Sequence, residues 1–157
     1  MAEWELAQIN IGRLVAPLDD PRIAGFVEQL DSINGMAERM TGFRWRLQSD
    51  AGNATDIVFS DDPFVIVNMS VWDSVESLRQ FTYRLREHVQ ALRDRAQWFE
   101  KLALPHHCLW WVPAGHRPSV AERRQRLEHY QRHGPTPEAF WFGREFPEPV
   151  GEAVLSR

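Results

Sequence analysis

The segment Phe64–Trp72 constrains the fold more than any other part of the chain. Its sequence, FVIVNMSVW, is apolar at most positions and is followed directly by DSVE and a long stretch with helical periodicity. Side chains alternate between the two faces of a strand, so Asn68, Ser70 and Trp72 share one face of a buried strand. A polar pair on such a strand is costly unless partners satisfy it. Other side chains, water or a ligand must therefore lie against this face, which suggests a pocket.

The remaining periodic segments place this strand within a single α+β domain. The spacing predicts strands over residues 5–14, 43–47, 64–72 and 107–112, helices over 21–40, 75–92 and 119–133, and short strands at 57–59 and 139–142. Asp73 and Glu76 form a capping box at the start of the second helix. The order strand, helix, strand, strand, helix, strand is that of the ferredoxin-like split βαβ fold. We expect residues 1–143 to form this domain and residues 144–157 to form a loose tail.

Residues 5–14 carry a second polar pair, because Gln8 and Asn10 alternate with apolar residues. In this fold two helices cover one face of the sheet and leave the other face bare. A bare face that carries rings and amides would not suit a monomer, and two sheets packed face to face in a homodimer would cover it. We therefore predict a homodimer, and a cavity between the sheet and its helices. Its candidate ligand-binding residues are Gln8, Asn10, Trp45, Asn68, Ser70, Trp72 and Trp111.

Composition excludes several classes of function. A net charge of −4 gives no attraction toward nucleic acid or an anionic membrane surface. No apolar run reaches the roughly 18 residues that a membrane-spanning helix needs, and the N-terminus lacks the basic start of a signal peptide. The single Cys108 rules out an intrachain disulfide, and it is consistent with a cytoplasmic protein. No glycine-rich phosphate loop or dinucleotide fingerprint is present.

The histidines do not indicate a metal site. His106 and His107 are adjacent and so point to opposite faces of a strand, where they cannot easily share an ion. His129 and His133 lie four residues apart on a polar helix, but without the glutamate of a His-Glu-x-x-His zinc motif. His116 stands at the end of a strand, where it could act as an acid, a base or an axial haem ligand. It could equally be a turn residue that bonds to nearby backbone.

Four segments of the chain resemble one bacterial family. They are Leu6-Ala-Gln-Ile-Asn-Ile-Gly-Arg-Leu14, Gly42-Phe-Arg-Trp-Arg-Leu47, Asn68-Met-Ser-Val-Trp72 and Leu109-Trp-Trp-Val-Pro-Ala-Gly-His116. Through Phe142 the chain is similar to the family called domain of unknown function 3291, with a departure at Pro105-His-His-Cys108. That family resembles a branch of the dimeric α/β-barrel superfamily, which includes antibiotic-biosynthesis monooxygenases and haem-degrading monooxygenases.

The resemblance implies a function and a site. The cofactor-independent, quinone-forming monooxygenases of that superfamily place an Asn and a Trp four residues apart on this strand, with an Arg on the next helix. Asn68 and Trp72 match this pattern, and Arg86 or Arg93 falls near the helix position. The implied reaction is oxidation of an aromatic or polyketide-like compound without a tightly held cofactor. The Asn would bond a substrate oxygen, the Arg would stabilise its charge and the Trp would stack on the ring.

Two other interpretations stay open. The first is a haem-binding or haem-degrading protein with His116 or His107 as the iron ligand. The second is a non-catalytic dimeric binding or accessory protein, in which the strand amides form a structural network and meet no substrate. If the protein is an enzyme, we expect Asn68, Trp72, Arg86 and His116 to be its catalytic residues.

Overall fold

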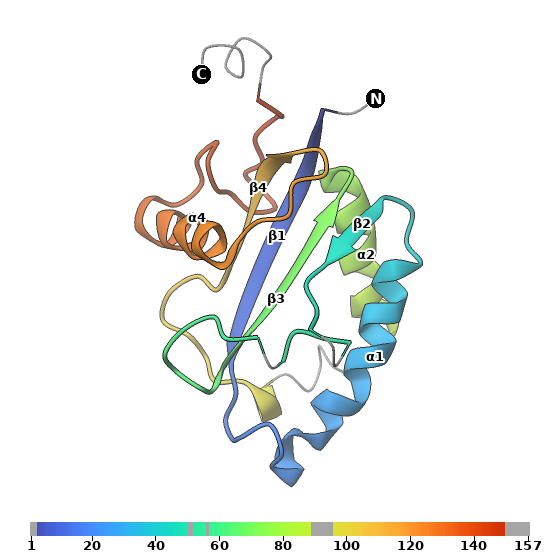
Figure 1. Cartoon of the computed structure of the whole chain (residues 1–157), viewed down its shortest axis with the longest axis vertical. Helices are drawn as coiled ribbons and strands as arrows, with labels where there is room; N and C mark the ends of the chain where they lie inside the picture. The colour runs from blue at the N-terminus through green and yellow to red at the C-terminus, as the bar shows by residue number, and fades with distance from the viewer. Residues whose placement is uncertain (1–2, 50–51, 56, 89–95, 150–157) are drawn as a thin grey trace.

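The sheet has four antiparallel strands. The computed structural model describes residues 3–49, 52–55, 57–88 and 96–149. Its strands are β1 (Trp4–Arg13), β2 (Phe43–Arg46), β3 (Val65–Trp72) and β4 (His107–Pro113), in the spatial order β2-β3-β1-β4. Figure 1 shows β1 and β3 side by side at the centre of the sheet. No helix within the described ranges has both the length and the hydropathy to cross a membrane.

Helices pack on both faces of the sheet. The helix α1 (Ala24–Glu38) follows a short 3-10 helix (Pro21–Ile23) and, together with α2 (Val75–His88), covers one face. The helix α4 (Val120–His133) packs on the other face, and Figure 1 shows it on the opposite side of the strands from α1. The element order and the antiparallel sheet confirm the predicted α+β, ferredoxin-like split βαβ fold.

The pairing of β1 with β3 brings the two predicted polar pairs together. Gln8 lies opposite Ser70, and Asn10 lies opposite Asn68. The same face carries Trp72, which packs against side chains of α1 and α2. The amides therefore lie beneath these two helices, on the side where the cavity is predicted.

The prediction of a bare sheet face is wrong. The face opposite α1 and α2 carries no amides but a set of fully buried apolar residues: Ala7, Ile9, Met69, Val71, Cys108 and Trp110. Leu127 and Tyr130 of α4 cover this face, as does Phe59, whose carbonyl accepts a hydrogen bond from the guanidinium of Arg124. Because the chain covers the face itself, a bare face no longer argues for a homodimer. The homodimer remains a prediction, and the molecular mass measured by light scattering can test it.

A bulge in β2 changes which side chains face the helices. Phe43 pairs with Trp72 and Arg46 pairs with Ser70, but the register shifts between Phe43 and Trp45. One extra residue reverses the alternation of side chains. Arg46 consequently shares with Phe43 the face that α1 and α2 cover, while Trp45 packs against the core on the opposite face. The strict alternation predicted for this strand is therefore wrong at Arg46.

Some local features also differ from the prediction. Ser74 rather than Asp73 caps α2, because its Oγ accepts a hydrogen bond from the backbone N–H of Ser77 at 3.1 Å. Residues 57–59 form no strand, and residues 139–142 contribute isolated bridges and tight turns instead of a regular strand. The four main strands have strong hydrophobic patterns and were predictable, whereas these short pieces depend on contacts with the rest of the chain.

The C-terminal segment contacts the sheet up to Phe146. The indole N–H of Trp111 donates to the carbonyl of Phe146 at 2.9 Å, and the Phe146 ring lies 5.8 Å from the ring of Phe140. Glu145 pairs with Arg79 of α2. Residues 150–157 lie outside the described residues, so a loose tail beginning at residue 144 stays a prediction.

Cys108 is expected to be unreactive in the folded protein. Its side chain is fully buried in the core, and this burial raises the pKa of the thiol to about 12. Only the thiolate reacts readily, so iodoacetamide at about pH 8 should modify Cys108 only after unfolding. Mass spectrometry of samples treated with and without urea measures this difference. Fast labelling of the native protein would contradict the buried placement of the thiol.

Candidate functional site

A cavity of about 220 Å³ lies between the sheet and the helices α1 and α2. Side chains from the strands, from both helices, from residues 53–55 and from the pair Trp98 and Phe99 form its wall. An engineered cavity of about 150 Å³ in another protein holds a benzene molecule. The cavity can therefore accept a single aromatic ring, and it lies where the sequence predicts one.

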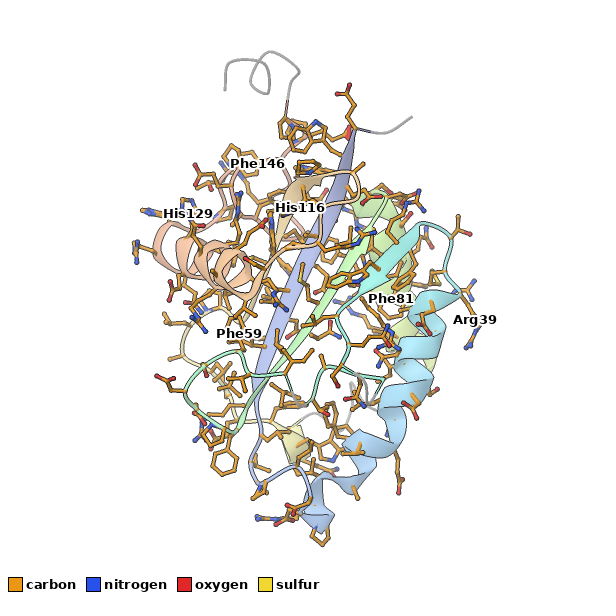
Figure 2. The ribbon with its side chains drawn as sticks, viewed as in Figure 1. Arg39, Phe59, Phe81, His116, His129 and Phe146 are labelled. Carbon is orange, nitrogen blue, oxygen red and sulfur yellow. The ribbon has the colours of Figure 1, made fainter. Side chains whose placement is uncertain are left out.

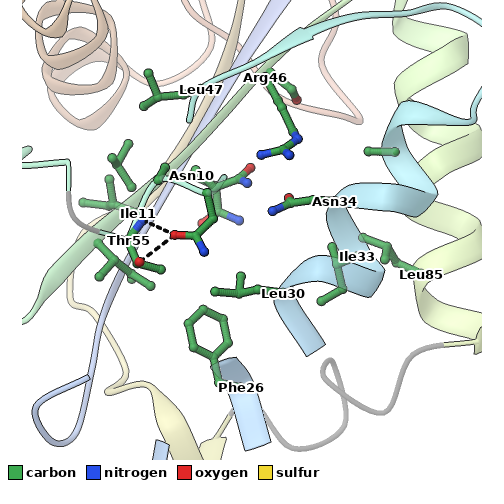
Figure 3. A pocket seen from close by; sticks show the side chains of 18 of the residues that line it. Asn10, Ile11, Phe26, Leu30, Ile33, Asn34, Arg46, Leu47, Thr55 and Leu85 are labelled. Carbon is green, nitrogen blue, oxygen red and sulfur yellow. Dashed lines mark hydrogen bonds between the residues drawn. The ribbon is translucent and has the colours of Figure 1, made fainter. Parts of the chain in front are cut away.

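One end of the cavity is apolar. Phe26 and Leu30 project into it from α1 (Figure 3), and the Phe26 ring lies 5.9 Å from Trp98 and 5.0 Å from Phe99. Gly12 of β1 makes room for these rings, because a Cβ at this position would lie 2.7 Å from the Phe99 ring. Ring faces and edges of this kind suit an aromatic or aliphatic ligand group.

The other end of the cavity is polar. Figure 3 shows Arg46, Asn10 and Asn34 grouped at this end, above Leu30 and Phe26. All four asparagines of the chain line the cavity, together with Ser70: Asn10, Asn34, Asn53 and Asn68. Among the described lining residues, Arg46 is the only one that carries a charge. The polar end thus combines amides with one cation and contains no carboxylate from these residues.

A chain of hydrogen bonds supports the β3 side of the polar end. The amide nitrogen of Gln8 donates to Oδ1 of Asn68 at 2.8 Å and to Oγ of Ser70 at 2.9 Å. The indole N–H of Trp72 also donates to Oγ of Ser70, at 2.8 Å. Gln8 and Ser70 are each 7% exposed, and Trp72 has no exposed surface. Because these three residues are buried, their bonds hold Ser70 and Asn68 in place at the cavity wall. Asn68 itself is exposed, so the expectation that both members of the polar pair are buried is correct for Ser70 and wrong for Asn68.

The opposite side of the polar end is formed by the chain that follows β2. Oδ1 of Asn53 accepts hydrogen bonds from the backbone N–H of Thr55 at 3.0 Å and from its hydroxyl at 2.6 Å. Arg46 donates through Nη1 to the carbonyl of Gly52 at 2.8 Å, and through Nε to Oε2 of Glu38 at 3.2 Å. The Arg46 side chain is 12% exposed, whereas that of Glu38 is 45% exposed and faces solvent. These bonds fix the guanidinium beside the cavity.

Three of the predicted site residues line the cavity: Asn10, Asn68 and Ser70. Gln8 and Trp72 lie behind them in the hydrogen-bonded chain. The Trp72 ring stacks on Phe81 of α2 with ring centroids 5.2 Å apart, and so it belongs to the core rather than to the cavity wall. The predicted roles of these residues in binding or catalysis remain predictions.

The other predicted site residues lie elsewhere. Trp45 packs on the opposite face of the sheet, with the guanidinium of Arg117 5.7 Å from its ring. Trp111 lines a separate open groove beside the start of α2. Arg86 is exposed on α2 and is not among the residues that line the cavity, and Arg93 lies outside the described residues. The cation of the cavity comes from β2 rather than from the helix.

The histidines considered as haem ligands lie away from the cavity. His116 follows β4 and contacts Oε1 of Glu122 through Nε2 at 2.6 Å. His107 stacks on Trp141, with ring centroids 3.5 Å apart and planes at 9°. Figure 2 shows His116 and His129 on the side of the molecule that carries α4. Within the described part of the chain, no three His, Cys, Asp or Glu side chains lie together as metal ligands would.

Three lining residues were not among those predicted from the sequence. Asn34 stands within the buried stripe of α1 and is only 9% exposed. A buried amide in an amphipathic helix needs a partner, so its position was a usable signal. The bulge hid Arg46, because alternation alone places it on the solvent side. Asn53 lies in a loop, where asparagine is common for local reasons.

Solved structures share similarity with the chain at low sequence identity. A protein of unknown function from Nitrosomonas europaea is 13% identical, with a TM-score of 0.43, over 74% of this chain and 97% of that one. The cofactor-independent oxygenase SnoaB from Streptomyces nogalater is 16% identical, with a TM-score of 0.40, over 75% of this chain and 97% of that one. An uncharacterized NIPSNAP domain protein from Burkholderia xenovorans is 18% identical, with a TM-score of 0.41, over 73% and 99% of the two chains. Similarity at this level carries no argument about activity.

A family match extends over nearly the whole chain. The chain matches none of the curated proteins. The sequence profile of one family matches residues 5–156, a range that includes the four β-strands except Trp4 and every described residue of the cavity wall. The resemblance expected from the sequence is therefore confirmed, and the chain belongs to the family described as Domain of unknown function (DUF3291).

Proposed function

We propose that the protein is a small-molecule enzyme of the oxygenase type, which oxidises an aromatic compound in the cavity and needs no tightly held cofactor. The division of the cavity into an aromatic end and a polar, cationic end carries this proposal. Such a site suits a ring that bears an oxygen substituent. The spacing of Asn68 and Trp72, which resembles that of quinone-forming monooxygenases, adds support. A cytoplasmic location belongs to the same proposal.

The proposed reaction is the oxidation of a phenol to a quinone by O₂. One oxygen atom enters at a ring C–H carbon, which becomes a carbonyl. The other oxygen atom leaves as water, with the hydrogens of that C–H and of the phenol O–H. The substrate supplies the electrons, so the reaction balances without a separate reductant. Donors held ready around a developing oxyanion are the usual source of catalytic stabilisation in a shielded site.

The lining residues fit defined parts of this reaction. The amide of Asn68 would stabilise the phenolate, which is the electron-rich form that reacts with O₂, and the charge of Arg46 would favour an anionic ligand. The rings of Phe26 and Phe99 would hold the aromatic body. Trp72 would act as a positioning residue, because it reaches the cavity only through its bond to Ser70. The family resemblance implies that Trp72 stacks on the substrate ring, whereas the proposed role of Trp72 here is to hold Ser70 in position.

Loss of the Asn68 amide tests the proposal. In an O₂-uptake screen with a panel of monocyclic phenols, Asn68→Ala is expected to lower kcat/KM by about a hundredfold, the usual effect of removing one oxyanion donor. Its free energy of unfolding should fall by only about 1 kcal/mol, because Asn68 accepts one hydrogen bond in the protein. Gln48→Ala, which removes an exposed amide one strand away, is the matched control and should change neither quantity.

Two results would contradict the proposal. If no phenol in the panel raises O₂ uptake above the protein-free rate, the oxygenase activity is excluded. If Asn68→Ala loses stability but keeps turnover or ligand binding, the amides are structural, as in a non-catalytic accessory protein. A haem-binding protein would instead give a Soret shift on haem titration that His116→Ala or His107→Ala abolishes. Neither histidine lines the cavity, so we favour the oxygenase.

A further inference from the structure

Asn34 is a buried residue whose side-chain amide has no hydrogen-bond partner among the described residues. It is 9% exposed, and it belongs to α1, whose other buried residues are Phe26 and Ala37. Within the described residues its side chain makes no hydrogen bond, although Figure 3 shows it directed into the polar end of the cavity. Buried amides are almost always satisfied, so the expected partner of Asn34 is a water or a ligand in the cavity.

The hydrogen bonds of three lining groups favour a ligand that accepts hydrogen bonds. Oδ1 of Asn53 already accepts two hydrogen bonds, and Oδ1 of Asn68 accepts one, which leaves their N–H groups to donate. Oγ of Ser70 accepts two hydrogen bonds, so its hydroxyl hydrogen is left to donate as well. Three of the lining groups therefore have their acceptors engaged and their donors free among the described residues.

Arg46 adds charge to this set of donors. Its Nε and Nη1 are engaged, but its Nη2 has no hydrogen-bond partner among the described residues. No other described lining residue is charged, and the carboxylate that pairs with Arg46 lies on the solvent side. The polar end therefore favours negatively charged oxygen, and it disfavours a cation.

The number of donors exceeds what a single phenolate oxygen can accept. Arg46, Asn34, Asn53, Asn68 and Ser70 each present at least one donor to the polar end. One oxygen has room for about three such bonds, whereas a carboxylate has about four acceptor sites of its own. A ring that carries both a hydroxyl and a carboxylate matches this excess.

We propose that the ligand is a monocyclic aromatic hydroxy acid. Its carboxylate lies at Arg46 and Asn53, its phenolic oxygen lies at Asn68 and Ser70, and its ring extends toward Phe26. This inference rests on the proposed function, because it takes the cavity as the substrate site. It goes further by naming the substrate class and by assigning the carboxylate to Arg46. The cavity volume of about 220 Å³ limits the body to a ring of this size rather than a fused polycycle.

Binding of salicylate tests the inference, with salicylamide as its neutral counterpart of nearly equal shape. In ligand-observed NMR titrations of the full chain, salicylate should bind at least about tenfold more tightly than salicylamide, a difference of about 1.4 kcal/mol. Arg46→Gln should reduce this ratio to about threefold or less, because it removes the charge. Arg44→Gln is the matched control: Arg44 is a neighbour on β2 that pairs with Glu5 at 3.3 Å and does not line the cavity. It should leave the ratio unchanged.

A second variant guards against loss of folding in Arg46→Gln. Asn68→Asp keeps the shape and the acceptor for Gln8 but adds a negative charge at the polar end. It should weaken salicylate strongly and salicylamide little. The inference is overturned if the wild-type protein binds both probes equally, if it binds no salicylate at millimolar concentration, or if both variants keep the wild-type ratio. These measurements involve no turnover, so O₂ uptake with a neutral phenol but no preference for salicylate refutes the inference and leaves the oxygenase proposal standing.

Discussion

Replacing Trp72 by alanine is expected to lower the free energy of unfolding by about 3–5 kcal/mol, the usual cost of deleting a large buried ring. The side chain has no exposed surface, stacks on Phe81 at 5.2 Å and meets Phe43 edge-on at 5.5 Å. It also anchors Ser70 through the indole N–H. Urea unfolding followed by circular dichroism measures the loss.

Trp72→Phe separates packing from hydrogen bonding at the same position. A phenyl ring keeps most of the contact with Phe81 but cannot donate to Ser70, so we expect a smaller loss of about 1–2 kcal/mol. If Trp72→Ala changed stability by less than about 1 kcal/mol, the indole would not be packed in the core as described. That result would support the role that the family resemblance implies for Trp72, which is to stack on the substrate.

Replacing Asn34 by leucine is expected to produce opposite effects on stability and on binding. An amide without a protein partner would be exchanged for an apolar side chain of similar size on the buried stripe of α1, so the ligand-free protein should gain about 1 kcal/mol. Salicylate affinity should fall by about tenfold or more, because a polar partner is lost and the leucine intrudes on the polar end. Urea unfolding and the NMR titration together measure both effects.

Gln29→Leu is the matched control for this prediction. Gln29 lies on the same helix, and its buried Oε1 also has no hydrogen-bond partner in the part of the chain that the structure describes, but it does not line the cavity. The control should raise stability by a similar amount and leave salicylate affinity unchanged. A destabilised Asn34→Leu protein with wild-type affinity would show that Asn34 supports the fold and does not contact the ligand.

The central strands were predictable because most of their residues are buried and their hydrophobic patterns are strict. Alternation placed Gln8 and Asn10 with Asn68 and Ser70 on one face, and the β1–β3 pairing bears this out. Alternation does not tell which layer covers that face, since either face of a sheet can receive helices. The sheet face that the ferredoxin-like fold leaves bare is covered here by α4. This helix has few apolar residues, such as Leu127, so its sequence did not predict that it packs on the sheet.

The cation of the cavity was not predictable from the same pattern. Strict alternation puts Trp45 inside and Arg46 outside, and a single bulge reverses both. A bulge depends on the hydrogen-bond register between two neighbouring strands. The sequence of residues 43–47 alone therefore does not predict it. The four asparagines of the chain all line this one cavity, a grouping that only the structure shows.

In the proposed complex the cavity between the sheet and the helices α1 and α2 holds the ligand with its anionic end at Arg46. A crystal structure of the protein with salicylate tests this claim most directly. We predict the carboxylate within hydrogen-bonding distance of Nη2 of Arg46, the phenolic oxygen beside Asn68, and the ring facing Phe26. Salicylate bound in the open groove beside Trp111, or bound in the cavity with its carboxylate directed at the aromatic end, would contradict the account.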